Sequence, residues 1–264
     1  MIDRGDAMPT IRRLALEAGH AIMEIDEDSR RFSARLQDDG SPVTVADTAA
    51  NRIITSGLSK AFPGIPVVSE ESARSQAPAE EMFFLVDPLD GTKEFLAGNG
   101  EFTVNIALIE SGVPVIGAIF APVLGELFFA CSGSGAFLQD GEGEPQRISS
   151  VPPYDPPRAV MSRSHLSEDE MSFVRASGIR EVRYAGSSLK GCLVAKGEAD
   201  VYFRAGDVME WDIAAMHCIL AESGGTIRLR NGARLSYGRP GFRVEGGFFA
   251  FGHIHPSLTR PLFP

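Results

Sequence analysis

The chain has 264 residues, of which 44% are hydrophobic and 23% charged, a composition typical of a folded globular protein rather than a disordered or fibrous one. Its formal net charge of −10 argues against binding to a nucleic-acid polymer or an anionic membrane surface. The three cysteines lie in apolar stretches without C-x-x-C spacing and are interpreted as free thiols of a cytoplasmic protein. We expect neither a signal peptide nor a membrane-spanning segment, and peripheral association with the inner membrane face stays open.

The first half of the chain predicts two helices followed by a sheet. Apolar residues recur at helical spacing over residues 9–25 and again over residues 45–62. Short apolar runs at 65–68 and 83–86 predict buried strands. The stretch 102–137 alternates β-rich segments with turn signals, which predicts a meander of strands.

The Pro-rich segment 151–157 is the predicted boundary between an N-terminal α+β half, residues 1–150, and a C-terminal α/β half, residues 151–264. The second half predicts strands alternating with helices, at 158–161, 168–177, 198–203 and 212–222. Asn231 and Gly232, placed between two short apolar runs, predict a two-residue hairpin turn.

Two aspartates mark the end of the strand predicted at 83–86. Asp87 and Asp90 stand three residues apart, and Pro88 between them is expected to stop the sheet ladder. The carbonyl of Leu89 lies between the two carboxylates, so this turn offers several hard oxygen ligands within a short reach. The alternative is ordinary turn and helix-cap chemistry, to which aspartate is equally suited.

The next residues predict a phosphate-binding turn. Gly91 and Thr92 are expected to open a helix whose free backbone N–H groups can hold a phosphate. Asp47 stands three residues after Thr44, a spacing that resembles a capping box with aspartate in place of glutamate. The functional alternative is that the Asp47 carboxylate accepts a hydrogen bond from the Thr92 hydroxyl, which orients and deprotonates a catalytic water.

Two further carboxylates are candidates for the same site. Glu70 follows a predicted strand, with exposed surface as the alternative, and Asp212 begins a predicted helix, with N-capping as the alternative. If both join Asp87 and Asp90, each pair at ~4 Å would repel by about 4 kcal/mol at an effective dielectric near 20. Such a cluster needs cations, and oxygen ligands without clustered Cys or His favour Mg²⁺, with Mn²⁺ as a substitute, over zinc.

Three ordered segments resemble the signatures of the inositol monophosphatase superfamily, namely SEE at 69–71, DPLDGT at 87–92 and WDIAA at 211–215. Within it, DGTKEF at 90–95 and GEFTVNIAL at 100–108 resemble the 3′(2′),5′-bisphosphate nucleotidases, and inositol phosphatases usually carry Asn where Glu94 stands. Further matching segments carry the resemblance from the first helix nearly to the C-terminus, at 162–165, 186–190 and 240–244.

This resemblance implies an α/β fold, a layered α-β-α-β-α sandwich of the sugar-phosphatase type. It implies a hydrolase of sulfur metabolism that converts 3′-phosphoadenosine 5′-phosphate to AMP and phosphate, uses two or three Mg²⁺ ions and is inhibited by lithium. One ion would generate hydroxide and another would stabilise the departing oxygen, with no covalent phosphoenzyme. The protein would be a monomer or a homodimer.

The resemblance also implies roles for individual residues. Asp47, Thr92 and Glu70 would be catalytic, with Asp47 and Thr92 activating the nucleophilic water. The implied metal ligands are Glu70, Asp87, the Leu89 carbonyl, Asp90 and Asp212. The implied substrate contacts are Glu70, Leu89, Asp90, Gly91, Thr92, His165, Ser187, Ser188, Lys190 and Asp212.

Several alternatives stay open. His165 could be a surface-loop residue and Lys190 a solvated cation. Residues 96–98, Leu-Ala-Gly, stand where related nucleotidases often have a basic pair, and Asp207 adds an acid, so a doubly phosphorylated substrate meets less positive charge. The rival functions are an inositol-phosphate or fructose-1,6-bisphosphate phosphatase of the same superfamily and a non-catalytic nucleotide or metal sensor.

Overall fold

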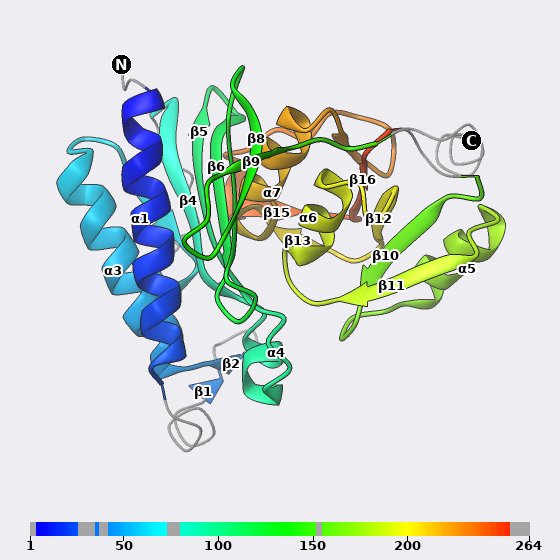
Figure 1. The fold of residues 1–264 in the computed structure, drawn as a ribbon, viewed down its shortest axis with the longest axis horizontal. Coiled ribbons are helices and arrows are strands. Elements are labelled where there is room, and N and C mark those ends of the chain that lie inside the picture. Colours follow the sequence, from blue (N-terminus) through cyan, green and yellow to red (C-terminus); the bar gives the residue numbers. More distant parts are fainter. Residues whose placement is uncertain (1–3, 26–34, 37–41, 73–79, 152–154, 254–264) are drawn as a thin grey trace.

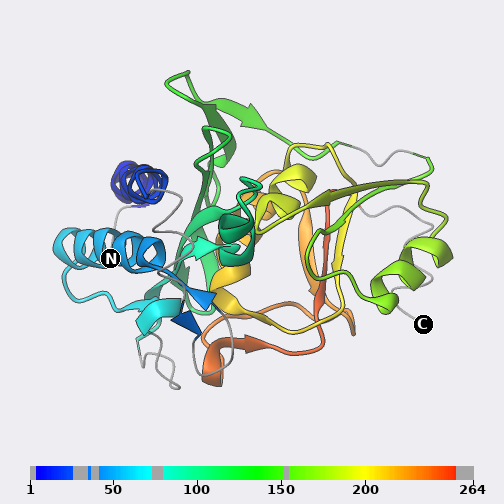
Figure 2. The ribbon, with the colours of Figure 1, turned by 90° about the horizontal axis from the view of Figure 1, so that it is seen from below.

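The computed structural model describes residues 4–25, 35–36, 42–72, 80–151 and 155–253. These residues form five layers, in which two sheets alternate with three layers of helices (Figure 1). Figure 2 shows the layers nearly edge-on, with the two N-terminal helices on one outer side and a helix of the second half on the other. The predicted α-β-α-β-α sandwich is therefore confirmed.

The first outer layer consists of helices α1 (Arg4–Met23) and α3 (Val45–Ala61), which pack against each other and against the large sheet. Helix α1 begins earlier than the predicted residue 9, because Ala7 and Met8 extend its buried face, and it includes Pro9 in its second turn at the loss of one backbone hydrogen bond. Helix α3 matches the prediction to within one residue. Their apolar faces and one side of the large sheet form a continuous core.

The large sheet has seven strands in the order β3-β4-β5-β6-β7-β8-β9. Only β3 and β4 run parallel, and the other neighbours are antiparallel, which confirms the predicted meander. The strands are β3 (Val67–Ser69), β4 (Met82–Asp90), β5 (Thr103–Glu110), β6 (Val113–Ala121), β7 (Glu126–Cys131), β8 (Gly135–Asp140) and β9 (Gln146–Ile148).

Strand β4 continues through Pro88, so the prediction that this proline stops the ladder was wrong. The strand pairs with β5 up to Asp87 opposite Asn105, and the pairing resumes one residue out of register at Asp90 opposite Thr103. The bulge accommodates Pro88, which has no N–H to donate to the ladder. It also turns the end of the strand so that both aspartates face the pocket described below.

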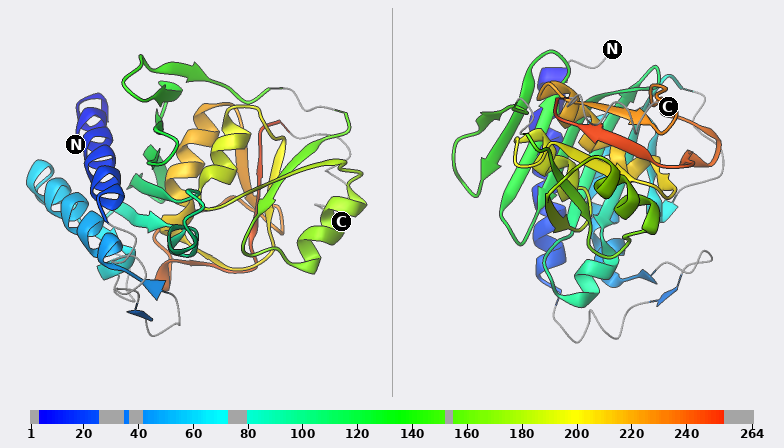
Figure 3. Two further views of the ribbon diagram at one scale, coloured as in Figure 1. Left: turned by 60° about the horizontal axis from the view of Figure 1, so that its bottom comes forward. Right: turned by 90° about the vertical axis from the view of Figure 1, so that its right-hand side faces the viewer.

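The second half supplies the middle helices and the small sheet. Helices α6 (Leu189–Ala195) and α7 (Glu210–Glu222) lie between the sheets, and α5 (Glu168–Ala176) covers the outer face of the small sheet (Figure 3). The small sheet has the order β11-β10-β12-β16-β14. Its strands are β10 (Arg158–Ser162), β11 (Glu181–Ala185), β12 (Val201–Arg204), β14 (Thr226–Leu229) and β16 (Phe248–Phe251).

The remaining described elements are short. They are β1 (Arg35–Leu36), β2 (Pro42–Val43), β13 (Val208–Met209), β15 (Arg243–Val244), the helix α4 (Thr92–Ala97) and the 3-10 helices η1 (Glu70–Ser72) and η2 (Pro240–Phe242). The predicted hairpin at Asn231 and Gly232 is present only as a turn with one isolated bridge, between Arg228 and Arg234. Strand β14 instead pairs along its length with β16, which buries it better than a free hairpin would.

Two boundaries in the second half differ from the prediction. Strand β12 begins at Val201 rather than at residue 198, because residues 197–200 turn back through hydrogen bonds to α6 and to Arg158. Helix α7 begins at Glu210, so Asp212 is its third residue rather than its first.

Among the described helices, none is both long and apolar enough to cross a membrane. The division into halves at 151–157 stays a prediction.

Candidate active site

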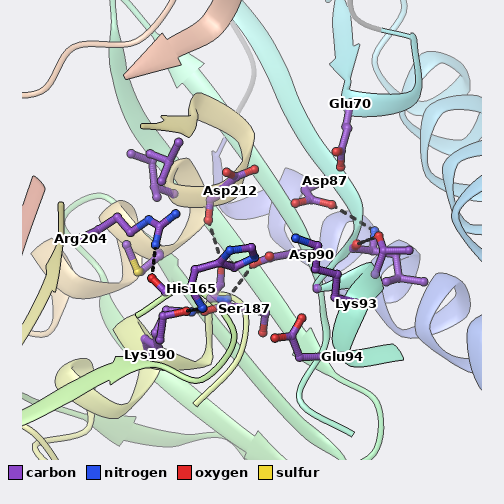
Figure 4. Close-up of a pocket in the computed structure, with 18 of the residues that line it drawn as sticks. Glu70, Asp87, Asp90, Lys93, Glu94, His165, Ser187, Lys190, Arg204 and Asp212 are labelled. Carbon is purple, nitrogen blue, oxygen red and sulfur yellow. Dashed lines mark hydrogen bonds between the residues drawn. The ribbon is translucent and has the colours of Figure 1, made fainter. Parts of the chain in front are cut away.

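A pocket of about 430 Å³ lies where the large sheet, the small sheet and the middle helices meet (Figure 4). It gathers nearly every candidate residue from the sequence, although these come from segments more than a hundred residues apart. Those that line it are Glu70, Asp87, Leu89, Asp90, Gly91, Thr92, His165, Ser187, Ser188, Lys190 and Asp212. Asp47 does not line the pocket but is hydrogen-bonded to Thr92.

The acidic side of the pocket comprises Glu70, Asp87, Asp90 and Asp212. Strands β3 and β4 are parallel neighbours, so the residues that follow them emerge at the same edge of the sheet. This places Glu70, the first residue of η1, beside the bulge that carries the two aspartates. The first turn of α7 brings Asp212 to the same place from the other half, and Figure 4 shows the four side chains around one space.

Backbone and hydroxyl donors hold three of these carboxylates. Asp87 Oδ1 accepts from the Leu89 N–H at 3.1 Å. Asp90 Oδ2 accepts from the N–H and the hydroxyl of Ser188, at 2.7 and 2.8 Å. Asp212 Oδ2 accepts from the Met209 N–H at 2.9 Å, so Asp212 supports the start of α7 from its third position, whereas the N-cap residue is Met209 and not Asp212 as the alternative had it; Asp212 also lines the pocket.

Burial raises the pKa of every carboxyl group on the acidic side, and the charges of neighbouring carboxylates add to the shift for Glu70, Asp87 and Asp212. Burial, followed by the charges of Asp212 and Glu71, raises the pKa of Glu70 to about 8. Burial and then the charge of Asp90 raise the pKa of Asp212 to about 7. The pKa of Asp87 is raised well above its usual value by burial and by Glu70, to which it is hydrogen-bonded. Four carboxyl groups at this spacing ionise together only when positive charge is supplied.

The donor set fits a hard divalent cation in its chemistry, because it offers only oxygen atoms. The Leu89 carbonyl belongs to this set, and its oxygen lies 3.3 Å from Thr92 Oγ1. Among the described residues, however, no group of three or more His, Cys, Asp or Glu side chains is already arranged to hold a metal ion. Glu70 and Asp87 instead bind each other, and Asp90 binds Ser188.

Asp47 serves helix α3 and the pocket with different oxygen atoms. Its Oδ2 accepts from the N–H and the hydroxyl of Thr44, at 2.7 and 2.6 Å, which completes the predicted capping box. Its Oδ1 accepts from Thr92 Oγ1 at 3.1 Å. The structure therefore contains both the capping box and the predicted hydrogen bond between Asp47 and Thr92, while the role of Asp47 in activating water stays a prediction. Burial raises the pKa of this carboxyl group.

The turn after Asp90 has the predicted form. Gly91 caps the short helix α4 (Thr92–Ala97) with a φ of 94°, a conformation that glycine adopts without strain. A Cβ at this position would approach the Glu101 carbonyl oxygen to 3.3 Å, so the turn also packs closely against the following segment. Gly91 and Thr92 therefore present backbone at the floor of the pocket.

The opposite side of the pocket is cationic, with Lys190, His165 and Arg204. Lys190 is 6% exposed and its pKa is lowered by burial, so the solvated-cation alternative was wrong. Its Nζ donates to the Ser187 carbonyl and lies 5.3 Å from the ring centre of Tyr202. Arg204 donates to the His165 carbonyl at 2.7 Å, and partial burial lowers the pKa of His165 at the pocket rim.

The sequence did not predict that Arg204 lines the pocket, nor that Ser187 has a strained backbone and a buried hydroxyl without a partner. Arg204 ends strand β12 without any motif around it, so only the fold brings it into the pocket. Ser187 has a φ of 45°, which is uncommon for a residue other than glycine, and its buried Oγ has no hydrogen-bond partner. Strain and an unpaired polar group at a pocket wall are features of ligand-binding positions.

The layered fold and the acid-lined pocket define an α/β protein of the phosphatase type. The chain belongs to the inositol monophosphatase family, whose model matches residues 8–256. It is 40% identical over 240 residues to the 3′(2′),5′-bisphosphate nucleotidase CysQ of Salmonella typhimurium, covering 88% of this chain and 96% of the relative. The corresponding enzyme of Escherichia coli K12 is 39% identical over 241 residues, with 88% and 97% covered.

Solved structures agree with this assignment. CysQ from Bacteroides thetaiotaomicron superposes with a TM-score of 0.79 at 33% identity, covering 96% of this chain and 98% of that one. An inositol monophosphatase from Thermotoga maritima gives a TM-score of 0.81 at 25% identity, covering 97% and 96%. The resemblance stated from the sequence, to the superfamily and to the nucleotidases within it, is confirmed, and with it the expectation of an enzyme.

Proposed function

We propose that this protein is a Mg²⁺-dependent 3′(2′),5′-bisphosphate nucleotidase that hydrolyses 3′-phosphoadenosine 5′-phosphate to AMP and phosphate. The observation that carries the proposal is a single pocket with an acidic side and a cationic side. A substrate with two phosphates needs both sides of the pocket. The acidic side would bind the phosphate that is cleaved, and the cationic side would bind the phosphate that is retained. The curated relatives named above carry this activity in their names.

The acidic side would bind the cations and the reacting phosphate. Two or three Mg²⁺ ions, with Mn²⁺ as a substitute, would be held by Glu70, Asp87, the Leu89 carbonyl, Asp90 and Asp212. When bound, the metal acts as a Lewis acid on phosphate oxygens and makes a water more acidic. The raised pKa values support this role, because a cation lets these carboxyl groups ionise at neutral pH.

Thr92 and Asp47 would orient and deprotonate the attacking water. The Thr92 hydroxyl donates to Asp47 Oδ1, so its oxygen lone pairs are left to accept a hydrogen bond from water. Glu70 would take part from across the site as a further proton acceptor. The backbone N–H groups of Gly91 and Thr92 would contact the phosphate at the start of α4.

The cationic side would bind the phosphate that is not cleaved. Lys190, His165 and Arg204 line the pocket together with Ser187, whose buried hydroxyl has no hydrogen-bond partner within the described protein. The positive charges of Lys190 and Arg204, within a largely negative protein, favour an anionic group at this wall, and the His165 ring offers a further hydrogen-bonding group. Ser188 would connect the two sides, because it is bound to Asp90 and lines the pocket beside Ser187.

An inositol-phosphate phosphatase is the second candidate, supported by the Thermotoga maritima structure. Phosphate release from 3′-phosphoadenosine 5′-phosphate, inositol 1-phosphate and fructose 1,6-bisphosphate separates the candidates. We expect the nucleotide to give the highest kcat/KM, with loss of activity in chelator and inhibition by lithium. A higher kcat/KM for inositol 1-phosphate would contradict the proposal, and nucleotide binding without turnover would favour the sensor. Cytoplasmic location and a monomeric or homodimeric state stay predictions.

A further inference from the structure

A charged contact bridges the segments that flank β5 of the large sheet and β10 of the small sheet. Glu101 precedes β5 of the large sheet, and Arg163 follows β10 of the small sheet. The guanidinium binds the carboxylate with two hydrogen bonds, Nε to Oε2 and Nη2 to Oε1, both at 2.7 Å. Such a two-pronged contact fixes the relative orientation of the groups as well as their distance.

The same carboxylate holds the loop that follows β11. Glu101 Oε2 also accepts from the Gly186 N–H at 2.8 Å, and Arg163 Nη2 donates to the Tyr184 carbonyl at 2.8 Å. A Cβ on Gly186 would lie 2.5 Å from the Glu101 carbonyl oxygen and 2.7 Å from Glu94 Cγ. Only glycine therefore allows this loop to lie directly on the segment after α4.

The loop at 186–188 has two anchors, and they serve different sides of the pocket. Ser188 is anchored on the acidic side by hydrogen bonds with Asp90, Asn105 and the Asp212 carbonyl. Gly186 is anchored by Glu101. Ser187, with its strained backbone and its carbonyl bound by Lys190, lies between the two anchors and belongs to the cationic side.

We infer that Glu101 and Arg163 are positioning residues for the cationic side of the pocket. Their contact holds Gly186 in place, and through it the Ser187 backbone and the Lys190 ammonium group that bind the retained phosphate. Because Ser188 has three further partners, loss of Glu101 leaves the acidic side in place. This inference rests on the proposed function, since it assigns the pair to recognition of the second anionic group.

An exposed ion pair by itself contributes little, so the neighbouring contacts carry the inference. Arg183 and Glu198 form a comparable pair, with side chains 47% and 41% exposed, against 47% and 23% for Arg163 and Glu101. None of the four residues lines the pocket, but Glu101 binds Gly186, whereas among the described residues Arg183 and Glu198 have no hydrogen bond to the loop at 186–188. Glu198 is therefore the matched control for Glu101.

The test compares Glu101→Ala, Glu101→Gln and Glu198→Ala with wild type on two substrates in Mg²⁺. The first substrate is 3′-phosphoadenosine 5′-phosphate, and the second is p-nitrophenyl phosphate, which has a single phosphate. We expect Glu101→Ala to raise KM for the nucleotide about tenfold, a factor that corresponds to ~1.4 kcal/mol. The kcat for the nucleotide and both constants for p-nitrophenyl phosphate should change less than about threefold.

Glu101→Gln should give an intermediate KM, because its amide oxygen still accepts from Gly186, and Glu198→Ala should match wild type. Thermal unfolding midpoints identify any variant that has lost its fold, and Arg163→Met then tests the same contact from the other side. Equal losses on both substrates, or an unchanged nucleotide KM in folded Glu101→Ala, would overturn the inference. A wild-type protein that is inactive on the nucleotide would contradict the proposed function instead.

Discussion

The acidic and cationic sides of the pocket differ in how the chain builds them. On the acidic side, Asp87 and Asp90 stand three residues apart at the end of β4, with Glu70 directly after the neighbouring strand β3 and Asp212 added from α7. The cationic side consists of single residues from separate strands and loops, such as His165 and Arg204, held together by backbone contacts. The difference indicates that the chemistry is encoded locally, whereas substrate recognition depends on the assembled fold.

The two sides of the pocket also differ in how burial and neighbouring charges shift the pKa values of their side chains. Burial and repulsion raise the pKa values on the acidic side, which therefore requires added cations. On the cationic side burial lowers the pKa of Lys190, while the nearby Asp90 and Glu94 charges oppose that shift. Substitutions on the acidic side should therefore reduce kcat, and those on the cationic side should mainly raise KM.

The largest effect is expected for Asp90→Asn. The substitution removes one negative charge from the centre of the acidic side, and we expect kcat to fall by about 1000-fold, as for loss of a central electrostatic group. A malachite-green assay of phosphate release measures it. Asp200→Asn, which alters a buried carboxylate outside the pocket, should lower stability without lowering the turnover of folded protein. Near-normal kcat in Asp90→Asn would refute the metal role of the acidic side.

Thr92→Val should have the next largest effect. It removes the hydroxyl that donates to Asp47 while keeping the side-chain shape, and we expect kcat to fall roughly 100-fold with a small change in KM. Thr55→Val, which removes a hydroxyl bound to a helix carbonyl in α3, is the control. If the two variants turn over alike, the assignment of Thr92 to water activation is wrong.

Lys190→Met tests the cationic side. We expect KM for 3′-phosphoadenosine 5′-phosphate to rise about 30-fold, because a buried cation is lost from the wall that faces the retained phosphate. The KM for p-nitrophenyl phosphate should change much less. Lys196→Met, at the end of the same helix but paired with Glu126 and Glu198, is the matched control. An equal loss on both substrates would place Lys190 in catalysis rather than recognition.

The stability of the metal-free protein should fall as the pH rises. The native Glu70 carboxyl keeps its proton up to a pKa of about 8, against 4.5 for the free group, so the native state binds more protons than the unfolded chain between these values. Its contribution to stability is complete below pH 4.5 and is lost as the pH passes 8. Differential scanning fluorimetry in EDTA should show the midpoint falling by a few degrees over this window, and Mg²⁺ should reverse most of the fall. A flat profile would contradict the pKa assignments.

The smallest effect is expected for Asp207→Asn. Asp207 lies on the pocket lining and is held by Arg243 and the Gly246 N–H, so its negative charge opposes an anionic substrate near Arg204. We expect KM for the doubly phosphorylated nucleotide to fall about twofold to threefold at low salt, and less at high salt. Glu245→Gln is an exposed control outside the pocket lining. An increase in KM would show that Asp207 supports binding instead.

Much of the fold followed from local patterns. The apolar faces of α1 and α3 and the alternating segments of the meander determine which surfaces must be buried, so their positions were predicted within a few residues. The bulge at Pro88 was not predicted, because periodicity shows that a strand meets a proline but not whether its partner strand tolerates an extra residue. The start of α7 was misplaced because buried Glu210 accepts from the distant Gly238 N–H, a contact that no local pattern reports.

The residues of the candidate site also fall into two groups, those that a local sequence pattern predicted and those that only the folded structure brings together. Asp87, Asp90 and Thr92 could be found because one short segment combines carboxylates, a glycine turn and a hydroxyl. Arg204 and Glu101 could not, because each is a common surface residue type whose role depends on a loop distant in the sequence, that of His165 for Arg204 and that of Gly186 for Glu101. Residue type and spacing therefore identify the reacting groups, and tertiary contacts identify the groups that bind and orient.

The most direct test of the acidic side is a crystal structure of the protein grown with Mn²⁺ and measured near the manganese absorption edge. We predict anomalous density inside the pocket, within coordination distance of carboxylate oxygens from Glu70, Asp87, Asp90 and Asp212. Loss of this density in Asp90→Asn crystals grown under the same conditions would support the assignment further. A well-ordered pocket without anomalous density, in a protein that still releases phosphate, would contradict the account.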